Sequence, residues 1–192
     1  MLLPGVCGAV PFQDFQIWTN VTATGALEQV HPRLGGLLFW LEAQGRFGND
    51  ATTLSQGILR PGLGYVLSPT ASVWVGYAYV PTMEPFTTTD RNEQRVWEQF
   101  SWSTGTDLGA FSSRSRLEQR FRPPGSDVGW RFREKIMLSH PLDFAPGLYL
   151  LLSDELFINV NRTHWTNEGF NQNRVFSGIG FRWDENTRTE IG

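Results

Sequence analysis

Charged side chains that recur at every second position are the feature of this sequence best suited to chemistry. The run from 111 to 122 places arginines and a glutamate on a single face if it forms a β-strand, because side chains along a strand alternate between two faces. Other segments repeat the pattern more sparsely. We expect one common surface to carry Glu42, Arg46, Arg60, Arg95, Arg114, Arg116, Glu118, Arg120, Arg131, Arg133, Glu155 and Arg174.

This set of charges supports two interpretations. Arginine binds phosphate and carboxylate groups through two parallel hydrogen bonds, so the set could form an anion-selective channel or a site for a small anionic solute. Alternatively, the arginines and glutamates neutralise one another, fill a narrow interior and fix the register of the strands, since an unpaired charge away from water is costly. We favour the second interpretation and keep the first open.

A second candidate site is formed by His164, Thr166 and Glu168. The pattern loosely resembles the lipid A 3-O-deacylase barrels, in which histidine, serine and glutamate form a triad at the outer rim. Nucleophilic attack needs a base within hydrogen-bonding reach and a third group that orients this base. Here the hydroxyl belongs to threonine and the stretch has the composition of a loop, so we expect an ordinary solvated loop.

Composition excludes several classes of function. The chain has 192 residues and a net charge of −3, which argues against a general nucleic-acid-binding protein. Its single cysteine excludes an internal disulfide framework and a cysteine-built zinc site. The 3 histidines have no metal-ligand spacing, and no phosphate-binding loop or dinucleotide fingerprint occurs. We therefore expect no cofactor, no metal and no nucleic-acid partner.

Hydrophobic alternation with a period of two, interrupted by Gly, Pro, Asn and Asp, predicts an all-β protein. Sustained helical periodicity is absent, and no run of eighteen apolar residues occurs. The lengths of the segments suit tilted strands that cross a bilayer. We expect strands at 12–24, 36–47, 56–67, 71–80, 94–103, 111–122, 128–139, 148–160 and 173–183, and a last one starting near 187.

Periodicity alone does not separate a soluble barrel, with its apolar face inside, from an outer-membrane barrel, with its apolar face toward lipid. Mixed charges and small residues share the polar face, as a narrow interior requires, and aromatic residues such as Phe12, Trp18 and Tyr149 lie near strand ends. Glu134 and Asp154 are misfits on the apolar face. We predict an antiparallel transmembrane β-barrel with a lumen lined by arginine and glutamate, located in the bacterial outer membrane.

The ends of the chain suggest processing. Residues 1–11 resemble the tail of a secretory signal peptide that lacks its basic start. We assign residues 12–192 to the barrel domain and expect it to be shortened at its C-terminus, with ten strands present and twelve in the intact protein.

Six runs together resemble the domain of unknown function 2490 family, whose members are regarded as outer-membrane β-barrels of Gram-negative bacteria. The resemblance covers nearly all of residues 12–192 and implies a cleaved signal peptide and a final strand that ends in an aromatic residue. It implies no activity. The runs are DFQIWTN (14–20), LRPGLGYVL (59–67), RVWEQ (95–99), RLEQRF (116–121), DELFINVN (154–161) and GFNQNRVFSGIGFRW (169–183).

These observations lead to the expectation of a non-enzymatic envelope component. It would be a narrow pore, or a barrel whose charged and filled lumen binds a small anionic solute or a lipid, with outer-membrane lipid around it. Two alternatives stay open: a hydrolase that modifies lipid A or phospholipid, and a soluble lipocalin-like binding barrel.

Overall fold

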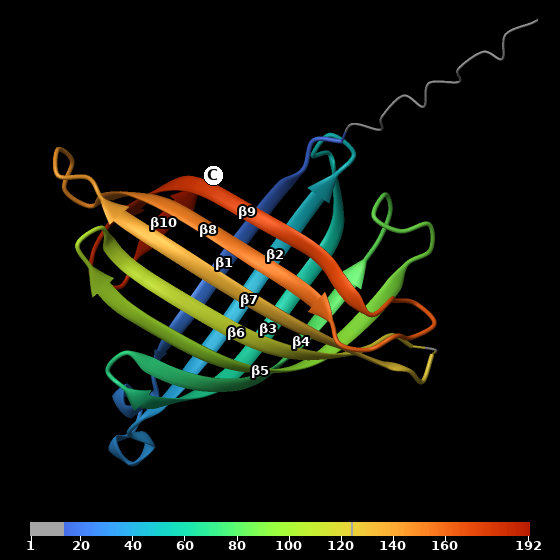
Figure 1. Ribbon diagram of the computed structural model, residues 1–192, viewed down its shortest axis with the longest axis horizontal. Coiled ribbons are helices and arrows are strands. Elements are labelled where there is room, and N and C mark those ends of the chain that lie inside the picture. The colour runs from blue at the N-terminus through green and yellow to red at the C-terminus, as the bar shows by residue number, and fades with distance from the viewer. Residues whose placement is uncertain (1–13, 124) are drawn as a thin grey trace, which may run out of the picture.

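The computed structural model describes residues 14–123 and 125–192, which form a single antiparallel sheet of ten strands. Each strand pairs with its neighbours in the sequence, and the sheet curls so that β7–β9 lie in front of β1–β3 (Figure 1). The strands are β1 (Ile17–Ala26), β2 (Leu37–Gly48), β3 (Thr53–Ser68), β4 (Ala71–Thr82), β5 (Arg91–Thr106), β6 (Gly109–Phe121), β7 (Val128–Pro141), β8 (Leu148–Asn159), β9 (Gly169–Arg182) and β10 (Arg188–Ile191).

The predicted all-β, antiparallel barrel-like fold is confirmed, and all ten expected strands are present. β3 and β5 each extend over 16 residues, well beyond the segments that the alternation marked. Two short 3₁₀ turns, η1 (Leu27–Gln29) and η2 (Pro32–Leu34), connect β1 to β2. Among the described residues, no helix has the length and apolar character needed to cross a membrane. The proposed signal-like segment 1–11 and Phe12 lie outside the described residues.

Short turns let consecutive strands pair as hairpins. β5 and β6 are joined by two residues, and Gly109, which opens β6, has φ +119°. A side chain there would be strained, and its Cβ would lie 2.1 Å from the backbone oxygen of Ser139. Glycine at this position therefore allows both the tight turn and the close approach of β7.

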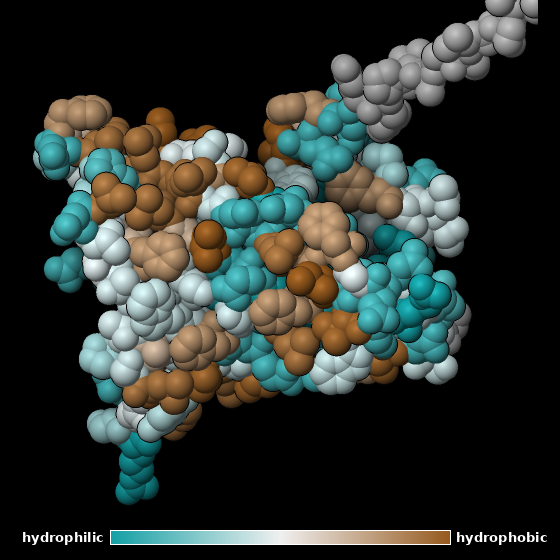
Figure 2. Space-filling view, viewed as in Figure 1, coloured by the Kyte–Doolittle hydropathy of each residue, from teal (hydrophilic) through white to brown (hydrophobic). Residues whose placement is uncertain are grey.

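The two faces of the curled sheet have opposite polarity. The concave face carries buried charged groups: Arg116 is 1% exposed and Arg133 is 7% exposed. The convex face is apolar and exposed, with Leu63 at 56%, Val75 at 53% and Ile179 at 52%. Figure 2 shows this outer surface as extended apolar areas interrupted by polar side chains. The protein is thus apolar outside and charged inside.

Two of the aromatic residues near strand ends do not belong to the outer face. Trp18 pairs with Arg46 in the register between β1 and β2, and both side chains lie on the concave side. Tyr149 also points inward, where its hydroxyl donates a hydrogen bond to Glu190 at 2.8 Å. Strand parity, rather than closeness to a strand end, decides the face that an aromatic residue occupies.

Small residues on the concave face make room for large rings. A Cβ at Gly62 or Gly76 would lie within 2.6 Å of the Trp97 ring, and a Cβ at Gly64 would lie 2.5 Å from the Trp74 ring. Trp97 is completely buried as a result. The glycines of the polar face therefore let this half of the interior be filled by indole rings.

Candidate functional site: a buried arginine–glutamate network

All twelve charged residues predicted to share a surface do lie on the concave face of the sheet. The structure adds three more residues to them, Glu93, Arg122 and Lys135. We call these fifteen residues the lumen network. Its members come from β2, β3 and β5–β9 and from the residue that follows β6, so the curl of the sheet brings them together.

Glu118 of β6 lies at the centre of the lumen network and is completely buried. One of its carboxylate oxygens accepts hydrogen bonds from Nε and Nη2 of Arg131 at 3.0 and 2.5 Å. The other oxygen accepts one from Nη1 of Arg133 at 2.6 Å. Nη1 of Arg95 lies 3.8 Å from the oxygen that binds Arg131. A single carboxylate thus holds together cations from two other strands.

Glu93 makes a second centre at the end of the barrel where β5 begins. It accepts hydrogen bonds from Arg95 at 2.6 Å and from Arg120 at 2.8 and 2.9 Å. Arg122 also donates to it. Buried ion pairs of this kind are stable only when each oxygen is satisfied, and here both are.

Glu155 and Glu42 complete the set of buried carboxylates in the network. Glu155 accepts hydrogen bonds from Arg114 at 2.7 Å and from Nη2 of Arg133 at 2.6 Å. Because Arg133 also contacts Glu118, the two carboxylates share one guanidinium. Glu42 pairs separately with Arg60 at 2.6 Å.

Arg116 has no carboxylate partner among the described residues, although it is almost fully buried. Its Nε and Nη2 donate to the side-chain oxygen of Gln99 at 2.8 and 2.5 Å, while Nη1 is out of contact with solvent and has no partner. The guanidinium carbon lies 4.6 Å from the ring centre of Trp97 and 6.0 Å from that of Trp40. Stacking on indole stabilises the cation, but one donor remains free.

Arg46 and Arg174 form another cationic pair without a carboxylate in the described chain. Their guanidinium carbons lie 4.3 and 5.0 Å from the ring centre of Trp18. Arg46 donates to Gln56 at 2.9 Å and to Gln44 at 3.2 Å, and its Nε is buried without a partner. The side-chain amides of Gln44 and Gln56 therefore bind Arg46 where a carboxylate partner would be expected.

Basic groups exceed carboxylates in the lumen network. The carboxylates are Glu42, Glu93, Glu118 and Glu155. The basic residues are Arg46, Arg60, Arg95, Arg114, Arg116, Arg120, Arg122, Arg131, Arg133, Lys135 and Arg174. Mutual neutralisation within the lumen network is therefore incomplete.

A loop closes over the end of the barrel where Glu93 lies. Trp165, in the connection 160–168, stacks on Arg120 and Arg122, whose guanidinium carbons lie 4.9 and 4.0 Å from its ring centre. A Cβ at Gly129 would lie 2.3 Å from the same ring, so this position of β7 admits only glycine beneath the indole. The loop thus covers this part of the network.

His164, Thr166 and Glu168 do not form a single hydrogen-bonded set. Nδ1 of the His164 ring contacts Asp127 at 2.8 Å, whereas the Thr166 hydroxyl accepts a hydrogen bond from Asn159 at 2.8 Å. Glu168 is exposed. The hydrogen bond from the His164 ring, with a second one from its backbone N–H, holds the pKa of the Asp127 carboxyl below its ordinary value. The histidine has an orienting carboxylate, but that partner is not Glu168, and the Thr166 hydroxyl is bonded elsewhere.

Three members of the lumen network were missed as site residues in the sequence. Glu93 continues the alternation of Arg95 and Trp97 by one step, but the strand was expected to start at 94. Arg122 and Lys135 belong to the alternating runs, yet only pairing across strands shows that they join the network. Within the described ranges, no group of three or more His, Cys, Asp or Glu residues is placed to hold a metal ion.

Comparisons with known proteins give a family but no activity. A family profile described as "Protein of unknown function (DUF2490)" matches residues 15–192. An uncharacterized protein from Methylorubrum extorquens is 35% identical over 188 residues, which cover 96% of this chain and 78% of that protein. No solved structure matches.

Proposed function

The chain belongs to the DUF2490 family of proteins of unknown function, and we propose that it is a bacterial outer-membrane β-barrel, a non-enzymatic component of the envelope. The observation that carries the proposal is the inverted polarity of the sheet. Buried arginines and glutamates fill the concave side, while leucine, valine and isoleucine are exposed on the convex side. Acyl chains satisfy such an outer surface, whereas water would leave it as a very large apolar patch.

We further propose that the lumen is filled and holds a small anion. A barrel of about this strand number has an interior just wide enough for side chains and one small ligand. Trp97, Arg116 and Glu118 are at most 1% exposed in that space, which favours a closed interior over an open pore. The excess of basic groups, and above all the free Nη1 of Arg116, favours an oxyanion such as phosphate or a carboxylate as the ligand.

Membrane fractionation tests the location. In Gram-negative cells that express the full-length protein, we expect it in the outer-membrane fraction, resistant to carbonate extraction and released only by detergent, because its convex face needs an apolar solvent. A soluble periplasmic protein in the same cells serves as the control. Recovery in buffer without detergent would instead support a lipocalin-like barrel and contradict the proposal.

Replacing Arg116 by methionine tests the anion site. For the protein in detergent, sodium phosphate should raise the unfolding midpoint above that in sodium chloride of equal ionic strength, because a ligand that binds only the folded state stabilises it. Each kcal/mol of such stabilisation corresponds to about 2–4 °C for a chain of this size. The rise should disappear in Arg116→Met and persist in Arg33→Met, which removes an exposed arginine of η2.

An equal rise in wild type and Arg116→Met would show that phosphate acts elsewhere, and no rise in wild type would argue against an anion site.

Conductance in planar bilayers separates the filled barrel from a pore. We expect no steps, and steps with anion preference would show that the lumen conducts.

A further inference from the structure

Three carboxylates face outward near the middle of their strands, each between two apolar residues of the same face. Glu98 of β5, Glu134 of β7 and Asp154 of β8 lie opposite Leu117, Leu156 and Ile136, respectively, on the neighbouring strands. We call Glu98, Glu134 and Asp154 the outer acidic row. Because β5–β8 are consecutive in the sheet, the row runs across one continuous patch of the convex face.

The protein satisfies the outer acidic row only in part. Glu134 accepts hydrogen bonds from the hydroxyls of Ser113 and Ser115 at 2.6 and 2.5 Å. Glu98 accepts one from the side-chain amide of Gln119 at 3.1 Å. Oδ1 of Asp154 is out of contact with solvent and has no partner among the described residues. No arginine or lysine occupies an outward position on β5–β8.

The rest of the convex face differs in this respect. The outward positions of β1–β4 and β9 carry no charged side chain. Acids are therefore confined to one side of the barrel. If charged residues were placed at random on the convex face, charges of both signs would occur all around the sheet. The observed outward charges are all acidic and lie on one side.

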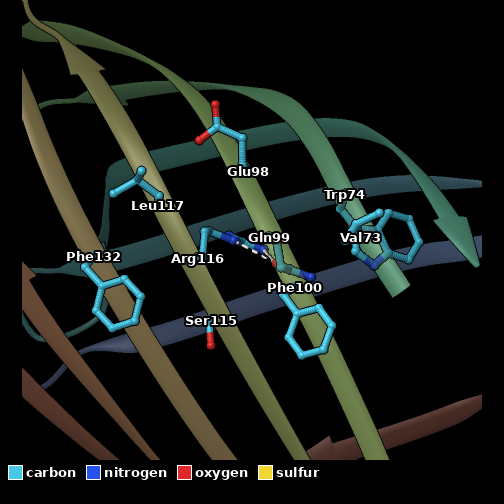
Figure 3. Close-up of a pocket in the computed structure, with 9 residues that line it drawn as sticks. All are labelled: Val73, Trp74, Glu98, Gln99, Phe100, Ser115, Arg116, Leu117 and Phe132. Carbon is cyan, nitrogen blue, oxygen red and sulfur yellow. Dashed lines mark hydrogen bonds between the residues drawn. The ribbon is translucent and has the colours of Figure 1, made fainter. Parts of the chain in front are cut away.

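A shallow groove of about 480 Å³ lies beside Glu98 on the same patch. Phe100, Leu117 and Phe132 line it from three adjacent strands, with the Glu98 carboxylate next to them (Figure 3). The patch thus combines an apolar groove, which accepts bulky side chains, with carboxylates, which accept hydrogen bonds.

We propose that the outer face of β5–β8 is a docking surface for a membrane-embedded protein segment that presents a lysine or arginine side chain. The inference rests on the proposed membrane location. Acyl chains offer no hydrogen-bond donor or charge to carboxylates at mid-strand, and ionisable groups in that environment characteristically have a protein partner. A second copy of this chain would bring acids against acids, since the face holds no base. A cationic segment matches both the charge and the groove.

Energy transfer in vesicles tests the proposal. The protein is inserted into phosphatidylcholine vesicles with a dansyl-labelled leucine-rich transmembrane peptide that has one central lysine, or the same peptide without the lysine. We expect transfer from the tryptophans of the protein to show about tenfold tighter association of the lysine peptide, because a polar contact within the membrane is worth ~1–2 kcal/mol in model peptides.

The triple variant Glu98→Gln, Glu134→Gln, Asp154→Asn should lose this preference. The matched control is Glu28→Gln, Glu84→Gln, Glu185→Gln, which makes the same change in net charge at exposed positions outside the strands and should keep it. Glu98→Gln alone, at an exposed position, should weaken the preference even if the triple variant folds poorly.

Equal association of both peptides, or a preference that survives in the triple variant, would overturn the docking proposal. Oligomers of the protein alone that the triple variant abolishes would identify a second copy as the occupant and overturn it too. Carbonate extraction of the same vesicles is the separate readout of membrane insertion. Protein that inserts but does not discriminate refutes docking alone, whereas protein that fails to insert refutes both proposals.

Discussion

Replacing Glu118 by glutamine is expected to lower the free energy of unfolding by about 3–5 kcal/mol, the usual effect of removing one partner from a buried charge cluster. The carboxylate is the only group in the described chain that forms an ion pair with Arg131, and it also binds Arg133. Glutamine has nearly the same shape but offers one acceptor oxygen, and its amide hydrogens face guanidinium donors. The variant would leave Arg131 in the interior without an ion-pair partner among the described residues, and Arg133 with Glu155 alone.

Urea unfolding of the protein in phospholipid vesicles, followed by tryptophan fluorescence, measures this effect. Glu185→Gln is the matched control, because it makes the same chemical change at an exposed position of the turn between β9 and β10. We expect that control to stay within about 0.5 kcal/mol of wild type. Similar losses in both variants would mean that Glu118 does not organise the interior.

A second substitution separates lost pairing from changed packing. Arg131→Gln removes a cation whose ion pair in the described residues is with Glu118, so the double variant restores the local balance of charge. Its destabilisation should therefore be smaller than the sum of the two single effects by about 1–3 kcal/mol. Additive effects would assign the loss in Glu118→Gln to packing alone.

The fold could be predicted from the sequence because strand parity is a local property. Alternation shows which residues share a face, and turn-forming residues such as Pro69 and Thr70 show where a strand ends. The same rule placed Arg116 and Arg133 on one side and Leu63 on the other, as the structure has them. Parity does not say how far a strand extends, and for that reason β5 was expected to start too late to include Glu93.

The pairings within the lumen network could not be predicted, because they depend on the curl of the sheet. Arg174 of β9 and Arg46 of β2 meet on Trp18 of β1, although β9 shares no hydrogen-bonded ladder with either strand. Glu155 is opposite Arg174 in the register, yet it bonds Arg114 and Arg133 instead. Side-chain length and barrel curvature decide such contacts, and neither follows from spacing along the chain.

Breaks in the alternation were as informative as the alternation itself. Glu134 and Asp154 were misfits on an apolar face in the sequence, and both point outward in the structure. If the sequence had assigned the wrong parity to these strands, the structure would have placed both residues in the interior with the other acids. Glu134 accepts hydrogen bonds from Ser113 and Ser115, whereas Oδ1 of Asp154 has no partner among the described residues. These outward acids are the basis of the proposed docking surface.

Replacing Gly76 by alanine is expected to destabilise the protein by about 3 kcal/mol, at the upper end of the usual effect of overpacking. The new Cβ would lie 2.3 Å from the Trp97 ring and 2.4 Å from the backbone oxygen of Pro61. The ring can move only by giving up its hydrogen bond to the oxygen of Tyr77 and its stacking with Arg116. The backbone oxygen belongs to the adjacent strand and cannot move independently. One methyl group would therefore disturb the sheet and the cationic interior together.

Gly105→Ala provides the matched control, because a Cβ there would have no atom within 4 Å. We expect its free energy of unfolding to stay near that of wild type in the same urea experiment. Adding Trp97→Phe to Gly76→Ala should recover only part of the loss, since a smaller ring relieves one close contact and leaves the one with Pro61. Full recovery would show that only the ring matters at this position. An unchanged stability in Gly76→Ala itself would mean that the indole does not fill the barrel between β3 and β4, and a filled lumen would then no longer follow.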